Sequence, residues 1–344
     1  MPMEEGLKRY LVQRALSIIP TFFGVVILIF VISRILPGNI AVEVLGPHAT
    51  AAQLQQFNAR FGLDQPLYVQ LFNFFVNLFQ GNLGISYQTN SSVIGDLETR
   101  FPATLELTTA AMIIATVLGV LIGTVSATSK RRYVDPASRL FSLYGVSLPE
   151  WWTGLLLQLG LAFGLGLFPP TGRFDYQSLN PPIHITGLYV VDSVLSLNWP
   201  AFTDSLWHLA LPAFVLSLGA MAQIARMTRS SLIEQLSKDY VTFQKENGLP
   251  DRIIVYKYML KSGFSSVLTI IGLTYAFLLG GDFLVESVFA WPGMGLYAVQ
   301  ALVFKDYNAI VGVVIVIGLS FIIVNFAVDL LYAYLDPRVR LRRG

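Results

Sequence analysis

The stretch RMTRSSLIEQLSKDYVTFQKENGLPDRIIVYKYMLKS, residues 226–262, decides how this chain is organised. It carries seven of the protein's 23 Lys and Arg residues, yet apolar residues recur at helical spacing, at Leu232, Leu236, Tyr240 and Phe243. That combination is typical of amphipathic helices held at a membrane surface. Apolar runs long enough to cross a membrane flank the stretch on both sides, so a partner that binds it can move membrane helices.

The composition of the whole chain indicates the same environment. Of its 344 residues, 54% are hydrophobic and only 13% are charged, whereas a soluble domain has about 25% charged residues. We therefore expect an all-α polytopic membrane protein. The chain has no cysteine, and its three histidines show no ligand-like spacing, so a metal centre is not expected. It also lacks any Gly-Lys dipeptide, so it has no phosphate-binding loop of the GxxxxGK[ST] type for ATP.

Six apolar stretches match the roughly 20 residues that cross a bilayer. They are predicted at about 11–35, 103–127, 140–168, 206–227, 264–284 and 308–334, and the third is interrupted at residues 147–150. The whole chain, 1–344, is expected to form one transmembrane domain. A long outer region, 37–102, separates the first two spans, and a basic inner region, 228–262, separates the fourth and fifth.

The distribution of Lys and Arg predicts the orientation, because these residues are enriched in cytoplasmic loops. If both termini are cytoplasmic, the inner segments hold 18 of the 23 basic residues. The five at the outer side or its edge are Arg34, Arg60, Arg100, Arg173 and Lys305. We therefore expect a multi-pass protein of the cytoplasmic membrane with both termini, and residues 226–262, in the cytoplasm.

Acidic residues inside predicted spans, Glu106 and Glu150 among them, are candidate functional sites, because a carboxylate in a membrane is costly. Glu106 lies in the first turn of the predicted second span, where it can stabilise a helix N-terminus. Glu150 follows Pro149, and proline commonly kinks membrane helices. Capping or interfacial solvation is expected for Glu106, and a structural kink for Glu150.

Other function classes fit the sequence less well. The predicted spans contain serines without an intramembrane His or Lys base, which disfavours a serine-dependent enzyme. Neither a carbonyl filter nor a ring of charges stands out, which disfavours an ion channel. A secondary transporter or channel that works alone remains the main alternative to a subunit of a larger transporter.

Longer motifs run through the chain in a fixed order. They are ILPGN (35–39), RFGLDQPLYVQ (60–70), GNLGIS (81–86), ATLELT (103–108), SLPEWWTGLLL (147–157), HLALPAFVLSLGAMAQIARMTRSSLIEQLSKDYV (208–241), LVESVFAWPGMG (284–295), KDYNAIVGV (305–313) and DLLYAYLDPRVR (329–340). In this order they resemble the permease subunits of ATP-binding cassette importers of the dipeptide, oligopeptide and nickel class, in particular the first, B-type permease. The resemblance covers essentially the whole chain.

The resemblance implies a set of partners and a mode of action. A six-span permease of this class pairs with a second homologous permease, two cytoplasmic ATPases and an external substrate-binding protein, within a lipid bilayer and without nucleic acid. The chain itself is expected to be no enzyme and to hold no cofactor, since ATP and Mg²⁺ bind to the ATPases. The implied cargo is peptide, or a similar solute such as an oligosaccharide or a nickel chelate, moved by alternating access.

The same resemblance assigns a coupling helix, which in this family fits a groove on an ATPase, to the loop after span four. The expected coupling residues are Asp239, Tyr240, Lys245, Gly248 and Leu249. Gly248 suits a residue with positive φ just past a helix end. Gln244 and Glu246 stand where the family usually has small alanines, so the docking surface is expected to differ from that of relatives.

The loop 282–305 is the candidate for an outer gate or for contact with the binding protein. Its candidate residues are Glu286, Trp291, Pro292 and Gly293. An equally open interpretation is a rigid loop that only packs two spans together.

Overall fold

The computed structural model describes residues 2–35, 46, 48–129, 133–280 and 283–335. Within these residues the secondary structure is helical, apart from turns, loops and one isolated antiparallel bridge between Ile85 and Ser92, which confirms the all-α prediction. The helices are α1 (Pro2–Ile35), α3 (Ala51–Phe61), α4 (Leu67–Phe79), α5 (Val93–Thr128), α6 (Val134–Ser147), α7 (Glu150–Leu157), α8 (Tyr189–Leu195), α9 (Trp199–Leu236), α10 (Asp239–Glu246), α11 (Asp251–Ile253), α12 (Leu260–Leu279), α13 (Phe283–Val288), α14 (Met294–Val303) and α15 (Tyr307–Leu335), with π-helical turns at η1 (Gln158–Gly164) and η2 (Ile254–Met259).

Four helical segments in the described part of the chain are long and apolar enough to cross a membrane. They are Val93–Thr128, Trp199–Leu236, Asp251–Leu279 and Tyr307–Val328. Each overlaps a predicted span, and a shorter apolar helix, Leu16–Ile32, lies within the predicted first span. The protein is therefore a multi-pass membrane protein.

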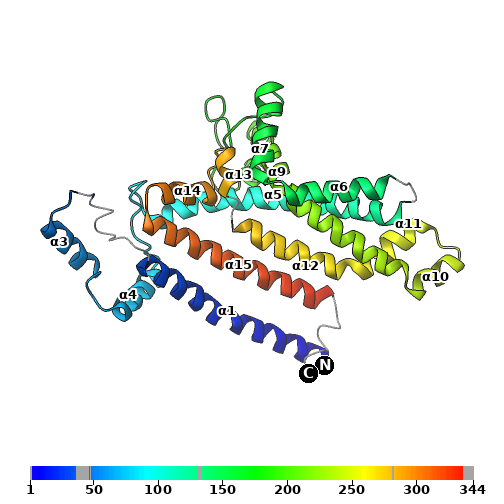
Figure 1. The fold of residues 1–344 in the computed structure, drawn as a ribbon, viewed down its shortest axis with the longest axis horizontal. Coiled ribbons are helices and arrows are strands. Elements are labelled where there is room, and N and C mark those ends of the chain that lie inside the picture. Colours follow the sequence, from blue (N-terminus) through cyan, green and yellow to red (C-terminus); the bar gives the residue numbers. More distant parts are fainter. Residues whose placement is uncertain (1, 36–45, 47, 130–132, 281–282, 336–344) are drawn as a thin grey trace.

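The predicted third span, 140–168, is two helices rather than one interrupted helix. α6 ends at Ser147, and α7 begins at Glu150. Leu148 and Pro149 between them have extended backbone, with ψ of 134° and 130°. A proline disfavours the helical conformation of the residue before it, so the chain leaves α6 here and sets off in a new direction along α7 (Figure 1).

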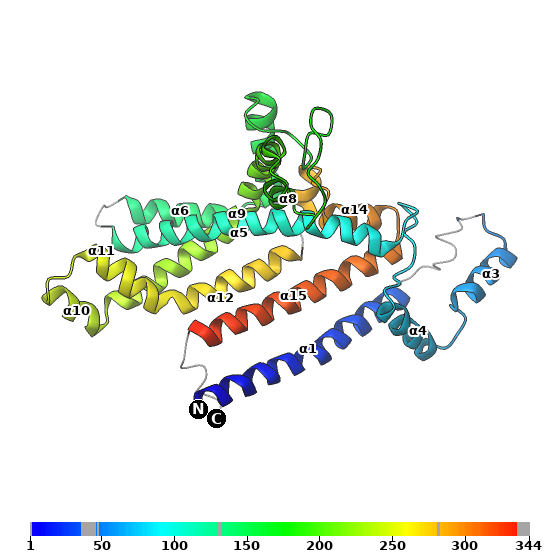
Figure 2. The same cartoon turned by 180° about the vertical axis from the view of Figure 1, so that it is seen from behind.

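α9 is the central helix of the bundle. It packs against α5, α6, α7, α8 and α12, and α12 in turn packs against α15 (Figures 1 and 2). Small residues allow α5 and α9 to approach closely. A Cβ atom on Gly123 of α5 would lie 2.5 Å from the carbonyl oxygen of Ala225 on α9, so this crossing admits only glycine.

Aromatic side chains hold α4 against α1. The rings of Phe23 and Phe75 have centroids 5.2 Å apart, and those of Phe30 and Phe74 lie 5.7 Å apart. Such tilted pairs add to the stabilisation from burying apolar area. α4 is too short to cross a bilayer, and it lies at the end of the bundle opposite α10 (Figures 1 and 2).

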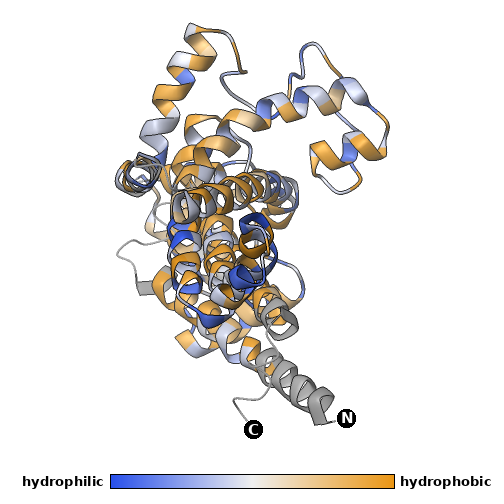
Figure 3. Ribbon diagram, turned by 90° about the vertical axis from the view of Figure 1, so that its right-hand side faces the viewer, coloured by the Kyte–Doolittle hydropathy of each residue, from blue (hydrophilic) through white to orange (hydrophobic). Residues whose placement is uncertain are grey.

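Polarity is distributed unevenly along the bundle. Viewed from the α10 end, hydrophilic residues gather on the elements nearest the viewer, whereas the long helices are mainly hydrophobic (Figure 3). The stretch 226–262 thus forms a polar end on an apolar bundle, as the sequence predicts.

Candidate functional site

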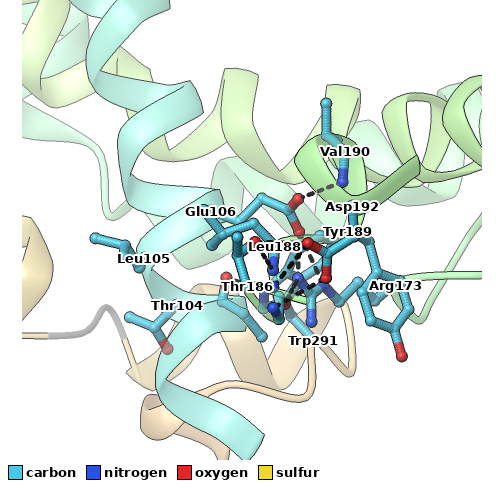
Figure 4. Close-up of polar contacts among 12 residues, drawn as sticks. Thr104, Leu105, Glu106, Arg173, Thr186, Leu188, Tyr189, Val190, Asp192 and Trp291 are labelled. Atoms are coloured by element: carbon cyan, nitrogen blue, oxygen red, sulfur yellow. Dashed lines mark hydrogen bonds and ion pairs between the residues drawn. The ribbon is translucent and has the colours of Figure 1, made fainter. Parts of the chain in front are cut away.

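A buried ion pair lies where α5 meets the loop that precedes α8. Arg173 Nε and Nη2 donate to Glu106 Oε2 at 2.9 and 2.5 Å, and the two side chains are only 4% and 7% exposed. The second carboxylate oxygen of Glu106 accepts from the backbone N–H of Val190 at 2.7 Å. The guanidinium also donates to Gly187 O at 2.7 Å and stacks over the Tyr189 ring at 4.0 Å (Figure 4). Both charges are therefore paired and hydrogen-bonded, as burial requires.

Asp192 organises the loop around this pair. Its carboxylate accepts hydrogen bonds from the backbone N–H groups of Ile185, Thr186 and Gly187 and from the Thr186 hydroxyl, at 2.7 to 3.2 Å. Burial alone raises the pKa of Asp192, but the bonds from Thr186 and its neighbours outweigh it and hold this pKa below its usual value. The loop that carries Gly187 is thus fixed beside Arg173.

A second buried carboxylate ties the α13–α14 turn to α5. Thr104 Oγ1 donates to Glu286 Oε1 at 2.7 Å and accepts from Met294 N at 2.7 Å, and Leu296 N donates to Glu286 Oε2 at 3.0 Å. Gly293 passes directly over this network. A Cβ atom there would lie 2.4 Å from Thr104 Oγ1 and 2.5 Å from Glu286 Oε2.

Trp291 lies at the same contact between the α13–α14 turn and α5. Its side chain is fully buried, and its Nε1–H donates to Ala103 O at 2.8 Å. On the other side of the turn, Gly172 N donates to Phe289 O, and Gln158 Nε2 donates to both Pro170 O and Val288 O. Residues 103–106 of α5 therefore anchor two loops that are far apart in the sequence. We call these contacts the outer network (residues 103–106, 172–192 and 286–296), because the sequence predicts that they lie on the outer side of the membrane.

This geometry corrects one expectation from the sequence and bears on a second. Glu106 is not in the first turn of its helix, because α5 begins at Val93. Ser92 caps that helix, since its hydroxyl oxygen accepts a hydrogen bond from Gly95 N. Glu106 is instead the partner of Arg173. Three of the four candidate gate residues, Glu286, Trp291 and Gly293, are buried within the chain, and Pro292 is half-buried. The geometry supports packing by this turn, and a contact with a binding protein stays a prediction.

At the opposite end, α10 carries three of the five candidate coupling residues, and Gly248 and Leu249 lie just after it. Asp239, Lys245 and Gly248 are exposed, and Tyr240 and Leu249 are half-buried. Tyr240 OH donates to Gln235 Oε1 of α9 at 2.9 Å. Tyr240 and Leu249 pack against a small buried cluster of Leu232, Val241, Ile254 and Met259. These contacts attach α10 to the ends of α9 and α12.

Gly248 ends the helix as predicted. Its φ is +75°, its N–H donates to Lys245 O at 3.0 Å, and Leu249 N donates to Gln244 O at 3.1 Å. Glycine adopts this left-handed conformation without the cost that a Cβ atom imposes. No other atom lies within 4 Å of a Cβ placed there, so the constraint is conformational rather than steric.

Two residues that hold these sites in place were not identified from the sequence. Val241 is the fully buried anchor of α10, although the sequence pattern emphasised Tyr240 and Phe243, and Phe243 is 67% exposed. Arg173 was assigned only to the outer edge. Its pairing with Glu106 could have been inferred from the sequence, because a glutamate inside an apolar span requires a partner and few basic residues are predicted on the outer side.

The described part of the chain is a multi-pass helical bundle in which a short polar helix, α10, follows the longest helix, α9. Residues 115–341 match the family described as binding-protein-dependent transport system inner membrane component, and residues 7–108 match the N-terminal part of such membrane components. The chain belongs to this family. It is a membrane subunit of an ATP-driven importer and not an enzyme, since ATP hydrolysis lies in separate subunits.

Relatives agree with this placement, and one solved structure has a similar fold. The chain is 38% identical over 327 residues to the probable D,D-dipeptide transport system permease protein DdpB of Escherichia coli strain K12, which covers 95% of this chain and 96% of that protein. It is 33% identical over 333 residues to the glutathione transport system permease protein GsiC of Escherichia coli O6:H1, covering 97% and 99%. The fold is similar to a chain of the inward-facing MetNI methionine ABC transporter, with a TM-score of 0.50 and 17% identity over 70% of this chain and 96% of that one.

Proposed function

We propose that this chain forms half of the translocation path for peptides, beside a second homologous permease. Two ATPases bound in the cytoplasm drive the switch between inward-facing and outward-facing states. A substrate-binding protein delivers the cargo outside. Peptide is the proposed cargo because the relatives above are named for dipeptide and glutathione transport and match this chain over nearly its full length.

The observation that carries the proposal is the continuity of α9. This helix runs without a break from Trp199 to Leu236, about 57 Å at 1.5 Å per residue. Near its start, Asp204 accepts a hydrogen bond from Asp175 N in the outer loop, at 2.9 Å. At its other end, α10 begins three residues after Leu236. A force applied to α10 therefore reaches the outer loops through one rigid element.

In the proposed topology the six spans are α1, α5, the pair α6 and α7 with η1, α9, α11 to α12, and α15. Both termini and α10 then lie in the cytoplasm, where 18 of the 23 Lys and Arg residues would fall. The exposed residues Asp239 and Lys245 of α10, and Gly248 just after it, face the ATPase. Tyr240 and Leu249 transmit its movement to the spans.

The outer network would act as the moving outer gate. Because residues 103–106 hold both outer loops, and α5 packs along α9, the loops, α5 and α9 are proposed to move as one unit. Glu286, Trp291 and Gly293 would hold that unit together. Pro292, the half-buried member, is the proposed point of contact for the binding protein.

Co-purification and reconstitution test the proposal. A tagged chain expressed with its genomic neighbours should bring down two ATPases and a second permease, and liposomes containing all four should take up peptide only with ATP and the binding protein. If the purified chain alone moves solute across liposomes without ATPases, it is a secondary transporter or channel and the proposal is wrong.

A further inference from the structure

A polar hollow of about 950 Å³ lies between the end of α9, the start of α10 and the η2–α12 segment. Its wall includes Lys238, Tyr256, Leu260, Lys261, Ser262 and Phe264. The hollow adjoins the first turns of α12, where the polar end of the bundle gives way to an apolar span. Its wall thus combines hydrogen-bond donors with apolar side chains.

The charges in the hollow do not cancel. Lys238 forms an ion pair with Glu234, with Nζ 3.3 Å from Oε1. Lys261 forms no ion pair with any described residue, which leaves one positive charge in the wall. The hydroxyl groups of Tyr256 and Ser262 likewise have no hydrogen-bond partner in the described part of the chain, and all three side chains are exposed. The hollow therefore offers one cation and two free hydroxyl donors.

We propose that this hollow binds the phosphate group of an anionic phospholipid, with Lys261, Ser262 and Tyr256 as the donors. An ammonium group attracts phosphate as a point charge, and hydroxyl groups complete its hydrogen bonds. Leu260 and Phe264 favour a lipid over a soluble phosphate, because they offer apolar contact to the start of the acyl chains. The lipid would come from the inner leaflet of the membrane, because the orientation given under the proposed function places α10 in the cytoplasm.

The site would connect lipid composition to transport. Tyr240 and Lys238 of the α10 region also line the hollow, so a bound headgroup would contact the segment that is proposed to dock an ATPase. An anionic lipid would then stabilise the position of α10 relative to α12.

Lipid binding by the full-length purified chain tests the proposal. Native mass spectrometry would measure the affinity for phosphatidylglycerol and for phosphatidylcholine in wild type, Lys261→Gln and Lys257→Gln. Lys257 is the matched control, because it is exposed, lies one turn before Lys261 and does not line the hollow. We expect Lys261→Gln to weaken phosphatidylglycerol binding about fivefold, with Lys257→Gln and phosphatidylcholine unaffected. Lys261→Arg should restore part of the loss, and Ser262→Ala should weaken binding independently.

Three results would overturn the proposal. Equal losses in the Lys261 and Lys257 variants would indicate a diffuse surface effect, and no loss in either variant would exclude the site. Displacement of the lipid by inorganic phosphate would point to a soluble ligand. The experiment measures lipid bound to the isolated chain and does not measure uptake. None of these results would therefore contradict the proposed function in ATP-driven uptake.

Discussion

Arg173 and Glu106 lie 67 positions apart in the sequence, yet two guanidinium nitrogens of Arg173 reach one carboxylate oxygen of Glu106 at 2.9 and 2.5 Å. The pair joins the outer loop to the middle of a membrane helix. Removing one member of a buried pair leaves the other charge without compensation. The pair is therefore the point at which the outer network is most sensitive to substitution.

Glu106→Ala should destabilise the protein by about 3–5 kcal/mol, since it leaves the buried guanidinium of Arg173 unpaired. Thermal unfolding of the detergent-solubilised protein would measure this. The matched control is Glu234→Ala, which breaks the exposed pair with Lys238 at 3.3 Å and should change stability by less than about 1 kcal/mol. Equal effects of the two substitutions would show that the Glu106 pair is not structurally important.

Gly293→Ala should cost about 1–3 kcal/mol, because the added methyl group would overlap Thr104 and Glu286. Gly24→Ala is the control, since a Cβ on this α1 glycine meets nothing within 4 Å and alanine has the better helix propensity. The same unfolding measurement compares the two. A Gly293→Ala protein as stable as wild type would mean that the turn moves away from α5 without cost.

The lowered pKa of Asp192 predicts that the stability of the protein falls at acid pH. The pKa of Asp192 in the folded protein lies below its value of about 3.9 in the unfolded chain. The Asp192 carboxylate therefore contributes its full stabilisation at pH values above about 3.9. This contribution is lost as the pH falls through the folded pKa. Asp192→Asn should lower stability at neutral pH by about 1–3 kcal/mol and flatten the loss below about pH 4. The control Glu98→Gln removes an exposed carboxylate and should change the stability at neutral pH by less than about 0.5 kcal/mol. Unfolding curves at several pH values would detect the difference, and identical wild-type and Asp192→Asn profiles would contradict it.

Local features of this fold could be predicted from the sequence, because their causes are local. The end of α10 follows from Gly248, and the break near residue 148 follows from the conformational restriction that Pro149 places on its neighbour. The predicted second span begins at residue 103, whereas helix α5 begins ten residues earlier, at Val93. An apolar run indicates the membrane-embedded part of a helix, and not where that helix begins in water.

The candidate sites could be predicted only in part. The candidate coupling residues occupy one short segment, 239–249, so the sequence order alone places them close together. The outer network brings together α5, the loop before α8 and the α13–α14 turn, and such pairing depends on tertiary packing that no local pattern encodes. The sequence motifs point to Trp291 and Glu286, but they do not show that these side chains are buried against Ala103 and Thr104.

Substitutions of Gly248 test whether α10 transmits force from an ATPase to the spans, as proposed. Gly248→Val should strain the left-handed backbone at φ +75° by about 1–2 kcal/mol and should separate ATP hydrolysis from peptide uptake in proteoliposomes. Gly248→Asn adds a side chain of similar size, but asparagine tolerates this conformation, so it should remain coupled. Because a Cβ at this position meets nothing within 4 Å, a loss of coupling in both variants would indicate a steric contact with the ATPase rather than a backbone effect.

The most direct measurement of the central claim is a site-specific cross-link from α10 to an ATPase. The chain has no cysteine, so Lys245→Cys on exposed α10 and Thr99→Cys at the exposed outer end of α5 each provide a single reactive thiol. With a single cysteine introduced in the ATPase groove, Lys245→Cys should form a cross-linked product whose yield changes with ATP, and Thr99→Cys should form none. Absence of any product from Lys245→Cys in an assembled complex that still takes up peptide would contradict the assignment of α10 as the coupling helix.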